Sequence, residues 1–462
     1  MSTAIAPAPV VVPDPRTATT RRLLEAPILP TLLRLAAPSV LMMVVQAAVT
    51  TFDVFVLGWL GPEALAGVAL AFPLVMLMQT MSAGGMGGGV ASAVARALGA
   101  GRRADADALV VHALAIAGGM AAFFAAVVLA AGPALFRAMG GTGGTLDAAV
   151  AYSTVIFAGA FAPWALNTLA SVERGSGQMA LPAAVSAGGA LLHVALSPAL
   201  AFGWGPFPRL GVAGPALSAV VWYTLAAILL AIHLTSAGSL ARLSFRGFSW
   251  QARLFRDILG VGALGSLNTI QTNLTVLLLT GLVGPFGTFA LAGYGVGTRL
   301  EYLQIPLVFG FGSALVTMVG TNMGAAQVAR AEKVAWTGAL VAGSTTGVIG
   351  FVAAIFPEAW LTLFTHDPGA IEVGAHYLRI VGPTYGFFGL GLALYFASQG
   401  AQRMVWPLVA GFLRLALAVV GAWSARRWLG TGPEGIFVAI ALSFTLFGVT
   451  LAVWLRRGGW RR

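Results

Sequence analysis

Three polar side chains lie at helical spacing in an apolar stretch near the start of the chain. Gln46, Thr50 and Asp53 are four and three residues apart within residues 46–60, QAAVTTFDVFVLGWL, so a helix places them on one face. A carboxylate at membrane depth costs about 3 kcal/mol and usually faces a bundle interior or a water-filled cavity. Asp53 is therefore predicted to hold a proton or a cation. The alternative is structural: Asp53 caps a kink or pairs with an arginine.

A second acid, Glu301, lies inside another apolar run. Tyr294, Thr298 and Glu301 follow helical spacing, which predicts a polar helix face with Tyr294 lining a substrate cavity. Glu301 either binds a cation or forms a structural ion pair with Arg379 or Arg414, and the sequence favours neither account.

A polar stripe occurs in a third apolar run, with Asn268, Gln271 and Thr275 at helical spacing. Interhelical hydrogen bonds are the simpler explanation of such a stripe. Cavity lining is the interpretation that we favour, because Gln271 occupies the same place in an internal repeat as Gln46. These three residues, together with Gln46 and Thr50, are predicted to line the substrate cavity.

His193 is the one histidine with a candidate role in ion coupling. A lone histidine in an apolar segment is more often a hydrogen-bonded structural residue, but its titration near neutral pH suits a proton-transfer step. Met42 and Met76 are predicted to line the cavity, where flexible thioethers would adapt to varied apolar substrates. The alternative for both methionines is ordinary helix packing.

The composition is that of a polytopic membrane protein. Of 462 residues, 58% are hydrophobic and only 9% are charged, whereas soluble domains are about 25% charged. The chain contains no cysteine, which excludes disulfides and thiolate chemistry. Its single lysine, Lys333, is not in a Gly-Lys-Ser/Thr context, so no Walker-type ATP site is present. Transport would therefore use an ion gradient, or an ATPase partner that this chain does not contain.

Apolar runs separated by Gly, Pro and charged residues predict twelve membrane-spanning helices, each long enough for a bilayer. Their ranges are 31–57, 64–94, 107–131, 147–171, 179–202, 211–236, 256–283, 289–320, 332–356, 371–399, 405–428 and 434–456.

The predicted organisation is an all-α integral membrane protein with two six-helix lobes. Residues 1–29 are expected to form a disordered cytoplasmic tail, since they are rich in Pro, Ala and Thr and lack the apolar core of a signal peptide. Residues 30–236 are the N-lobe, residues 237–257 a cytoplasmic linker, and residues 258–462 the C-lobe.

The basic residues predict that both termini lie in the cytoplasm. With the N-terminus inside, 19 of the 26 Lys and Arg residues fall in cytoplasmic segments and 4 in outside loops, as the positive-inside rule requires. The pair Arg426 and Arg427 is the exception. The net charge of +11 is thus explained by membrane orientation, and no nucleic-acid partner is expected.

An internal repeat relates the two lobes. At an offset of 225 residues, identical residues recur across several predicted spans. The pairs are Gln46 with Gln271, Thr50 with Thr275, Gly99 with Gly324, Tyr152 with Tyr377, Gly175 with Gly400 and Pro182 with Pro407. Six spans per repeat is an even number, so the copies are expected to be related by a pseudo-two-fold axis along the membrane normal.

The stretch TFDVFVLGWLGPEALAGVALAFP resembles the first-to-second span signature of the multidrug and toxic compound extrusion (MATE) family. VARALGAG, its repeat mate VGTNMGAA and VERGSGQMALP are also similar to motifs of that family. The resemblance covers residues 31–457. It implies two lobes around a V-shaped cavity and the efflux of organic cations or amphiphiles, with Asp53 as the coupling carboxylate. His193 and Ser197 stand where many members have Asn and Asp, which argues against a sodium site in the N-lobe.

We therefore expect an alternating-access antiporter of the bacterial inner membrane. It would act as a monomer in the lipid bilayer, exporting small molecules in exchange for H⁺ without a bound cofactor. Coupling to Na⁺ and a flippase of lipid-linked or natural-product substrates are the alternatives within this scaffold. An intramembrane enzyme or a metal site is not expected, because the five histidines do not cluster with carboxylates. A passive channel is a further class, which currents without substrate dependence would reveal.

Overall fold

The computed structural model describes residues 15–236, 238–428 and 430–461. Within these residues the regular structure is helical, and eleven helices are long and apolar enough to cross a membrane. A pair of helices bent by 48° would together form a twelfth span. The predicted all-α membrane fold with twelve spans is confirmed.

The N-lobe contains six spans, two of which consist of more than one helical segment. Its helices are α2 (Ile28–Leu60), α3 (Pro62–Thr80), the π-helical turn η1 (Met81–Met86), α4 (Gly87–Gly99), α5 (Arg103–Ala138), α6 (Gly143–Ala158), α7 (Phe161–Gly175), α8 (Ala180–Phe202) and α9 (Ala213–Thr235).

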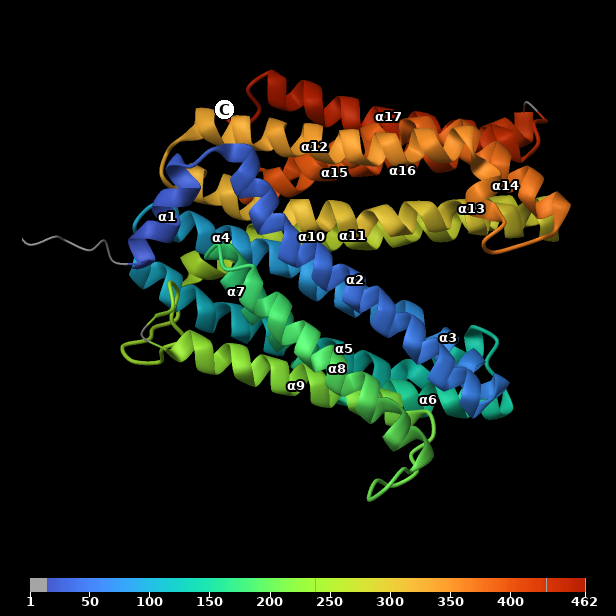
Figure 1. The fold of residues 1–462 in the computed structure, drawn as a ribbon, viewed down its shortest axis with the longest axis horizontal. Coiled ribbons are helices and arrows are strands. Elements are labelled where there is room, and N and C mark those ends of the chain that lie inside the picture. Colours follow the sequence, from blue (N-terminus) through green and yellow to red (C-terminus); the bar gives the residue numbers. More distant parts are fainter. Residues whose placement is uncertain (1–14, 237, 429, 462) are drawn as a thin grey trace, which may run out of the picture.

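The C-lobe repeats this order. Its helices are α10 (Ala252–Val283), η2 (Gly284–Phe286), α11 (Thr288–Gly324), α12 (Val328–Ile355), α13 (Pro357–Leu361), α14 (Pro368–Val381), η3 (Gly382–Thr384), α15 (Tyr385–Gly400), α16 (Val405–Trp428) and α17 (Pro433–Arg456). Figure 1 shows the lobes as two groups of helices that come together at the end where α1 and α4 lie.

The repeat is visible as matching helix contacts within the two lobes. A Cβ atom on Gly67 would lie 2.6 Å from the carbonyl oxygen of Thr145, and one on Gly293 would lie 2.4 Å from that of Ala370. In each lobe a glycine of the second span therefore lets the fourth span approach closely. Such small residues at helix crossings are typical of membrane bundles, where close backbone packing stabilises association.

The lobes meet through a reciprocal pair of glycine contacts. A Cβ atom on Gly99 would lie 2.1 Å from the carbonyl oxygen of Thr321, and one on Gly324 would lie 2.2 Å from that of Arg96. Both glycines therefore permit backbone approaches that any larger residue would prevent. Because each contact repeats the other with the lobes exchanged, a two-fold axis passes between them.

Hydrogen bonds reinforce the same junction. The Ser92 hydroxyl donates to the carbonyl oxygen of Gln399 at 2.5 Å, and the Thr317 hydroxyl donates to that of Arg174 at 2.7 Å. Ser92 lies in the middle of α4, Arg174 and Gln399 lie in the last turns of α7 and α15, and Thr317 lies in the second half of α11. The lobes are thus closed against each other at one end of the molecule.

The expected disordered tail is wrong for its second half. Residues 15–25 form helix α1 (Pro15–Glu25), in which Leu23 is buried. The side-chain amide of Asn322 donates to the carbonyl oxygen of Leu23 at 3.2 Å, and Arg330 donates to that of Ala26. Docking on the C-lobe therefore orders a segment whose own composition is polar. Residues 1–14 lie outside the described residues.

The segment that joins the lobes packs on the N-lobe. The backbone N–H of Gln251 donates to Nε2 of His112 at 2.9 Å, and Arg253 forms a salt bridge with Asp105 at 2.7 Å. Helix α10 begins at Ala252, so the last six residues of the predicted linker belong to the seventh span.

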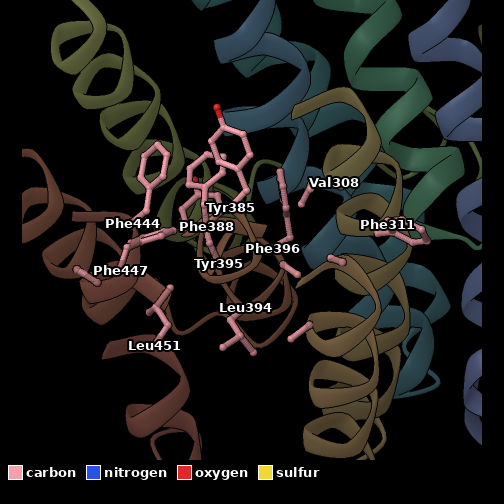
Figure 2. Packing of buried hydrophobic residues seen from close by; sticks show 14 of the residues in the cluster. Val308, Phe311, Tyr385, Phe388, Leu394, Tyr395, Phe396, Phe444, Phe447 and Leu451 are labelled. Atoms are coloured by element: carbon pink, nitrogen blue, oxygen red, sulfur yellow. The ribbon is translucent and has the colours of Figure 1, made fainter. Parts of the chain in front are cut away.

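Aromatic rings fill the core of the C-lobe. Figure 2 shows Phe388, Phe444 and Phe447 close together between neighbouring helices. Phe388 and Phe444 stack with ring centroids 4.6 Å apart. Arg414 of α16 reaches this cluster, with its guanidinium 5.4 Å from the Phe447 ring, so a charged residue is buried among the aromatic rings.

Candidate ion-coupling site and substrate cavity

Asp53 and His193 form a hydrogen-bonded pair inside the N-lobe. Helix α2 carries Asp53 and α8 carries His193, and the distance from Nε2 of His193 to Oδ1 of Asp53 is 2.8 Å. The His193 side chain is 1% exposed, whereas that of Asp53 is 26% exposed. The carboxylate is therefore accessible on one side and bound to a buried imidazole on the other.

A serine completes this arrangement from α9. The Ser218 hydroxyl lies 2.9 Å from Nδ1 of His193 and 3.3 Å from the carbonyl oxygen of the same residue. A neutral imidazole that donates to Asp53 can accept a hydrogen bond from Ser218. An imidazolium donates from both nitrogens, and the Ser218 hydroxyl can then donate to the carbonyl oxygen. Both protonation states of His193 therefore find hydrogen-bond partners.

A network of uncharged polar groups lies beside this pair. The Gln79 side-chain amide donates to the Tyr223 hydroxyl at 3.0 Å, and the Asn167 amide donates to Gln79 Oε1 at 3.2 Å and to the Ser82 hydroxyl at 2.8 Å. The Tyr223 ring stacks on Trp222 with ring centroids 4.9 Å apart, and the Trp222 ring lies 5.5 Å from that of His193. Polar side chains that can form hydrogen bonds with a proton carrier or a substrate therefore extend from Asp53 into the N-lobe.

Sequence reasoning missed Gln79, Asn167 and Ser218. They are uncharged single residues on three different helices, so no spacing pattern connects them. Gln79 could have been selected from the internal repeat, because Gln304 lies at the equivalent position 225 residues later.

The other four residues predicted for the N-lobe site lie on α2 and α3. Within the described residues, none of them forms a hydrogen bond with Asp53. The Thr50 hydroxyl donates to the carbonyl oxygen of Gln46 at 3.0 Å within α2. Met42 is half-buried and Met76 is 39% exposed. That these four residues line a substrate cavity stays a prediction.

A cavity of about 280 Å³ lies inside the C-lobe, among α10, α11, α14, α16 and α17. Thr275, Tyr294 and Glu301 line it, as does Arg414. The Tyr377 hydroxyl donates to Oε2 of Glu301 at 3.4 Å. The structure thus brings together three of the residues that the sequence singled out, from the consecutive spans α10 and α11, with Arg414 from the distant helix α16.

Gln271 and Asn268 lie beside α16. Gln271 is 2% exposed, and its side-chain amide donates to the carbonyl oxygen of Gly411 at 3.0 Å. A Cβ atom on Gly411 would lie 3.0 Å from Oδ1 of Asn268. Both side chains therefore lie against α16, where a glycine leaves room for them, and neither is among the residues that line the cavity. The hydrogen bond of Gln271 joins two helices, and a role of either side chain in lining a substrate cavity stays a prediction.

Of the two arginines that the sequence offered as partners of Glu301, Arg379 pairs with another acid. Arg379 is 52% exposed and forms a salt bridge with Glu358 at 3.6 Å. Arg414 does share the cavity with Glu301.

Arg426 is one of the two arginines that do not follow the predicted distribution of basic residues. Its guanidinium lies over the Phe286 ring at 5.7 Å, and this contact stabilises its charge.

Glu173 is a buried acid that sequence reasoning did not select. It is fully buried at the end of α7, and Oε1 lies 3.6 Å from Nε2 of His233. In the sequence it falls between the predicted spans 147–171 and 179–202. Within the described residues no group of three or more His, Cys, Asp or Glu side chains could hold a metal ion.

These features define a helical membrane transporter with an acidic site in one lobe and a polar cavity in the other. The sequence model of the MatE family matches residues 38–199 and 266–424, one stretch in each lobe. The chain therefore belongs to the MATE family of multidrug and toxic compound efflux transporters.

Named relatives match this chain over nearly their full length. The chain is 24% identical to a FAD transporter of Shewanella oneidensis, covering 92% of this chain and 94% of that protein. It is 29% identical to the probable multidrug resistance protein NorM of Deinococcus radiodurans, covering 91% and 93%.

Solved structures share the fold. A MOP superfamily transporter from Pyrococcus furiosus has a TM-score of 0.87 at 24% identity, covering 96% of this chain and 98% of that one. MATE in its bent conformation has a TM-score of 0.89 at 24% identity, with the same coverage.

Proposed function

We propose that this efflux transporter exchanges organic cations or amphiphilic compounds for protons, with Asp53 as the coupling residue. The observation that carries the proposal is the hydrogen bond of 2.8 Å between Asp53 and the buried His193. A carboxylate with one accessible side can take up either a proton or a cationic substrate, but its single charge cannot pair fully with both at once. That competition would link the two movements.

The donor set at Asp53 favours a proton over a sodium ion. A hard cation prefers several oxygen ligands, but one face of Asp53 is occupied by an imidazole nitrogen. Ser197, where the resemblance would place a carboxylate, is fully buried with an unpartnered hydroxyl. Sodium coupling is the alternative, and an imposed Na⁺ gradient tests it.

The transport cycle would alternate between two arrangements of the lobes. The glycine contacts of Gly99 and Gly324 close one end of the interface. With both termini in the cytoplasm, as the basic residues predict, the closed end faces inward and substrate leaves outward. Protonation of Asp53 would neutralise its charge, release the cation and favour this state. The protein would work as a monomer in the bacterial inner membrane, driven by the ion gradient.

Transport in proteoliposomes tests the proposal. Uptake of a fluorescent organic cation is measured under an imposed pH gradient and, separately, an imposed Na⁺ gradient. Transport driven by the pH gradient and lost in Asp53→Asn supports proton antiport. Asp147→Asn, which changes an exposed aspartate of the same lobe, is the matched control and should transport as wild type.

Two other results would overturn it. Transport driven by the Na⁺ gradient alone would establish sodium coupling instead. Full proton-driven transport by Asp53→Asn would remove Asp53 from the mechanism. If the cation is not moved by either gradient, a flavin nucleotide is the next substrate to test, because one relative is named a FAD transporter. A lipid-linked substrate would follow.

A further inference from the structure

The cavity of the C-lobe contains a buried arginine whose hydrogen-bonding capacity is not used. Arg414 is 6% exposed and lines the cavity, and its Nε has no hydrogen-bond partner among the described residues. A guanidinium carries five N–H donors. Burying such a group without partners costs free energy, so buried charges are normally paired.

Aromatic rings stabilise the cation only in part. The Arg414 guanidinium lies 5.6 Å from the Phe388 ring, 6.0 Å from the Phe444 ring and 5.4 Å from the Phe447 ring. Figure 2 shows these three rings grouped together. Rings attract a cation by its charge but accept no in-plane hydrogen bond from its N–H groups. The planar donor array therefore stays available for an anion, and a carboxylate fits it with two hydrogen bonds.

Glu301 supplies the opposite charge to the same cavity. Its side chain accepts one hydrogen bond, from the Tyr377 hydroxyl at 3.4 Å. Glu301 and Arg414 both line the cavity, but within the described residues no ion pair of 4.0 Å or less joins them. The two charged groups are therefore not in direct contact, and both border the same cavity.

We propose that this cavity binds a small zwitterion, with its carboxylate on Arg414 and its ammonium group on Glu301. Tyr294 and Phe444, which also line the cavity, would contact an apolar or aromatic side chain. The volume of about 280 Å³ is below the range of about 300–1,000 Å³ typical of drug-sized ligands. A ligand the size of an amino acid is therefore favoured. A simple cation or a simple anion would leave one of the two protein charges unpaired.

The proposal goes beyond proton coupling and does not rest on it, because the cavity lies wholly in the C-lobe. Binding to the purified full-length protein in detergent, measured by calorimetry, tests it. Three probes with the same ring are compared: L-phenylalanine, 2-phenylethylamine, which lacks the carboxylate, and 3-phenylpropionate, which lacks the ammonium group. L-Phenylalanine is expected to bind at least tenfold more tightly than either of the others.

Variants assign the two ends of the ligand. Arg414→Gln should weaken L-phenylalanine at least tenfold and abolish its advantage over 2-phenylethylamine. Glu301→Gln should abolish its advantage over 3-phenylpropionate. Arg379→Gln, which changes an exposed arginine of the same lobe, is the matched control. Asp53→Asn should bind like wild type whether or not it transports, so the two proposals fail independently.

Several results would overturn the proposal. These are equal affinity for the three probes, no binding of L-phenylalanine up to millimolar concentrations, or binding that neither variant changes. If Arg414→Gln does not fold, as judged by gel filtration, Arg414→Lys keeps the charge. This variant should still prefer L-phenylalanine over 2-phenylethylamine. If the preference is lost in the Arg379→Gln control but not in an Arg414 variant, the assignment of the carboxylate to Arg414 is contradicted.

Discussion

Asp53 and His193 are 140 residues apart in the chain and 2.8 Å apart in the structure, on helices α2 and α8. The imidazole is buried and the carboxylate is not. His193 is therefore placed to position Asp53 and to stabilise its charge, while the free side of Asp53 can exchange protons or meet a substrate.

Substitution of His193 should separate these roles. His193→Leu leaves Asp53 without its donor, and hydrogen bonds to charged groups contribute about 1.5–3 kcal/mol. Proton-driven transport should therefore fall about tenfold or more. His193→Gln keeps an N–H donor and should retain most of the activity. Equal activity of the two variants in proteoliposomes would show that the hydrogen bond is unimportant for transport.

Enlarging Gly99 or Gly324 should open the closed end of the lobe interface. An added methyl group would lie 2.1 or 2.2 Å from a carbonyl oxygen, so the lobes must separate, at a cost of about 1–3 kcal/mol. Because the natural chain has no cysteine, Ser92→Cys gives a single reporter at the interface. Its alkylation should become several-fold faster with Gly99→Ala. Gly119→Ala, which meets open space, is the control and should leave the rate unchanged.

The polar network beside Asp53 should contribute to stability. Tyr223→Phe removes the acceptor of the Gln79 amide and leaves a partly buried donor without its partner, which costs about 1–3 kcal/mol. Thermal unfolding in detergent should occur at a lower temperature. Thr224→Ala changes an exposed hydroxyl that bonds within its own helix, and its unfolding temperature should match wild type. A Tyr223→Phe protein as stable as that control would contradict the prediction.

Labelling can establish the orientation in the membrane. In intact cells, a maleimide that cannot cross the membrane should react with Thr142→Cys, in the loop between α5 and α6. It should not react with Ser249→Cys, in the segment between the lobes, until the cells are opened. Both positions are exposed. The reverse pattern would place the termini outside and invert the direction of the proposed cycle.

Span positions and the two-lobe organisation could be predicted because they depend on local composition and on a repeat that the chain itself displays. Asp53 and Glu301 were found for the same reason: an acid in an apolar run is conspicuous. The residues that surround them were harder to find. Ser218 and Asn167 are common residue types, and only the crossing of helices brings them to the site.

The error in the predicted disordered tail has a physical cause, and the repeat has a limit of its own. Helix α1 is polar in sequence and is ordered by docking on α11, an interaction that composition does not reveal. Gln271 matches Gln46 in the repeat, but Gly411 leaves a gap on α16 that the Gln271 side chain fills. Equivalent positions in the two lobes therefore have different surroundings, and a repeat predicts backbone position better than side-chain role.

The reciprocal contact of Gly99 with Thr321 and of Gly324 with Arg96 means that each half of the chain carries a self-complementary surface, as the subunits of a two-fold homodimer do. In a homodimer every substitution appears twice. A single chain keeps this symmetric closure without that restriction, so its two halves can differ elsewhere. Asp53, for example, has Leu278 at the equivalent position of the other half.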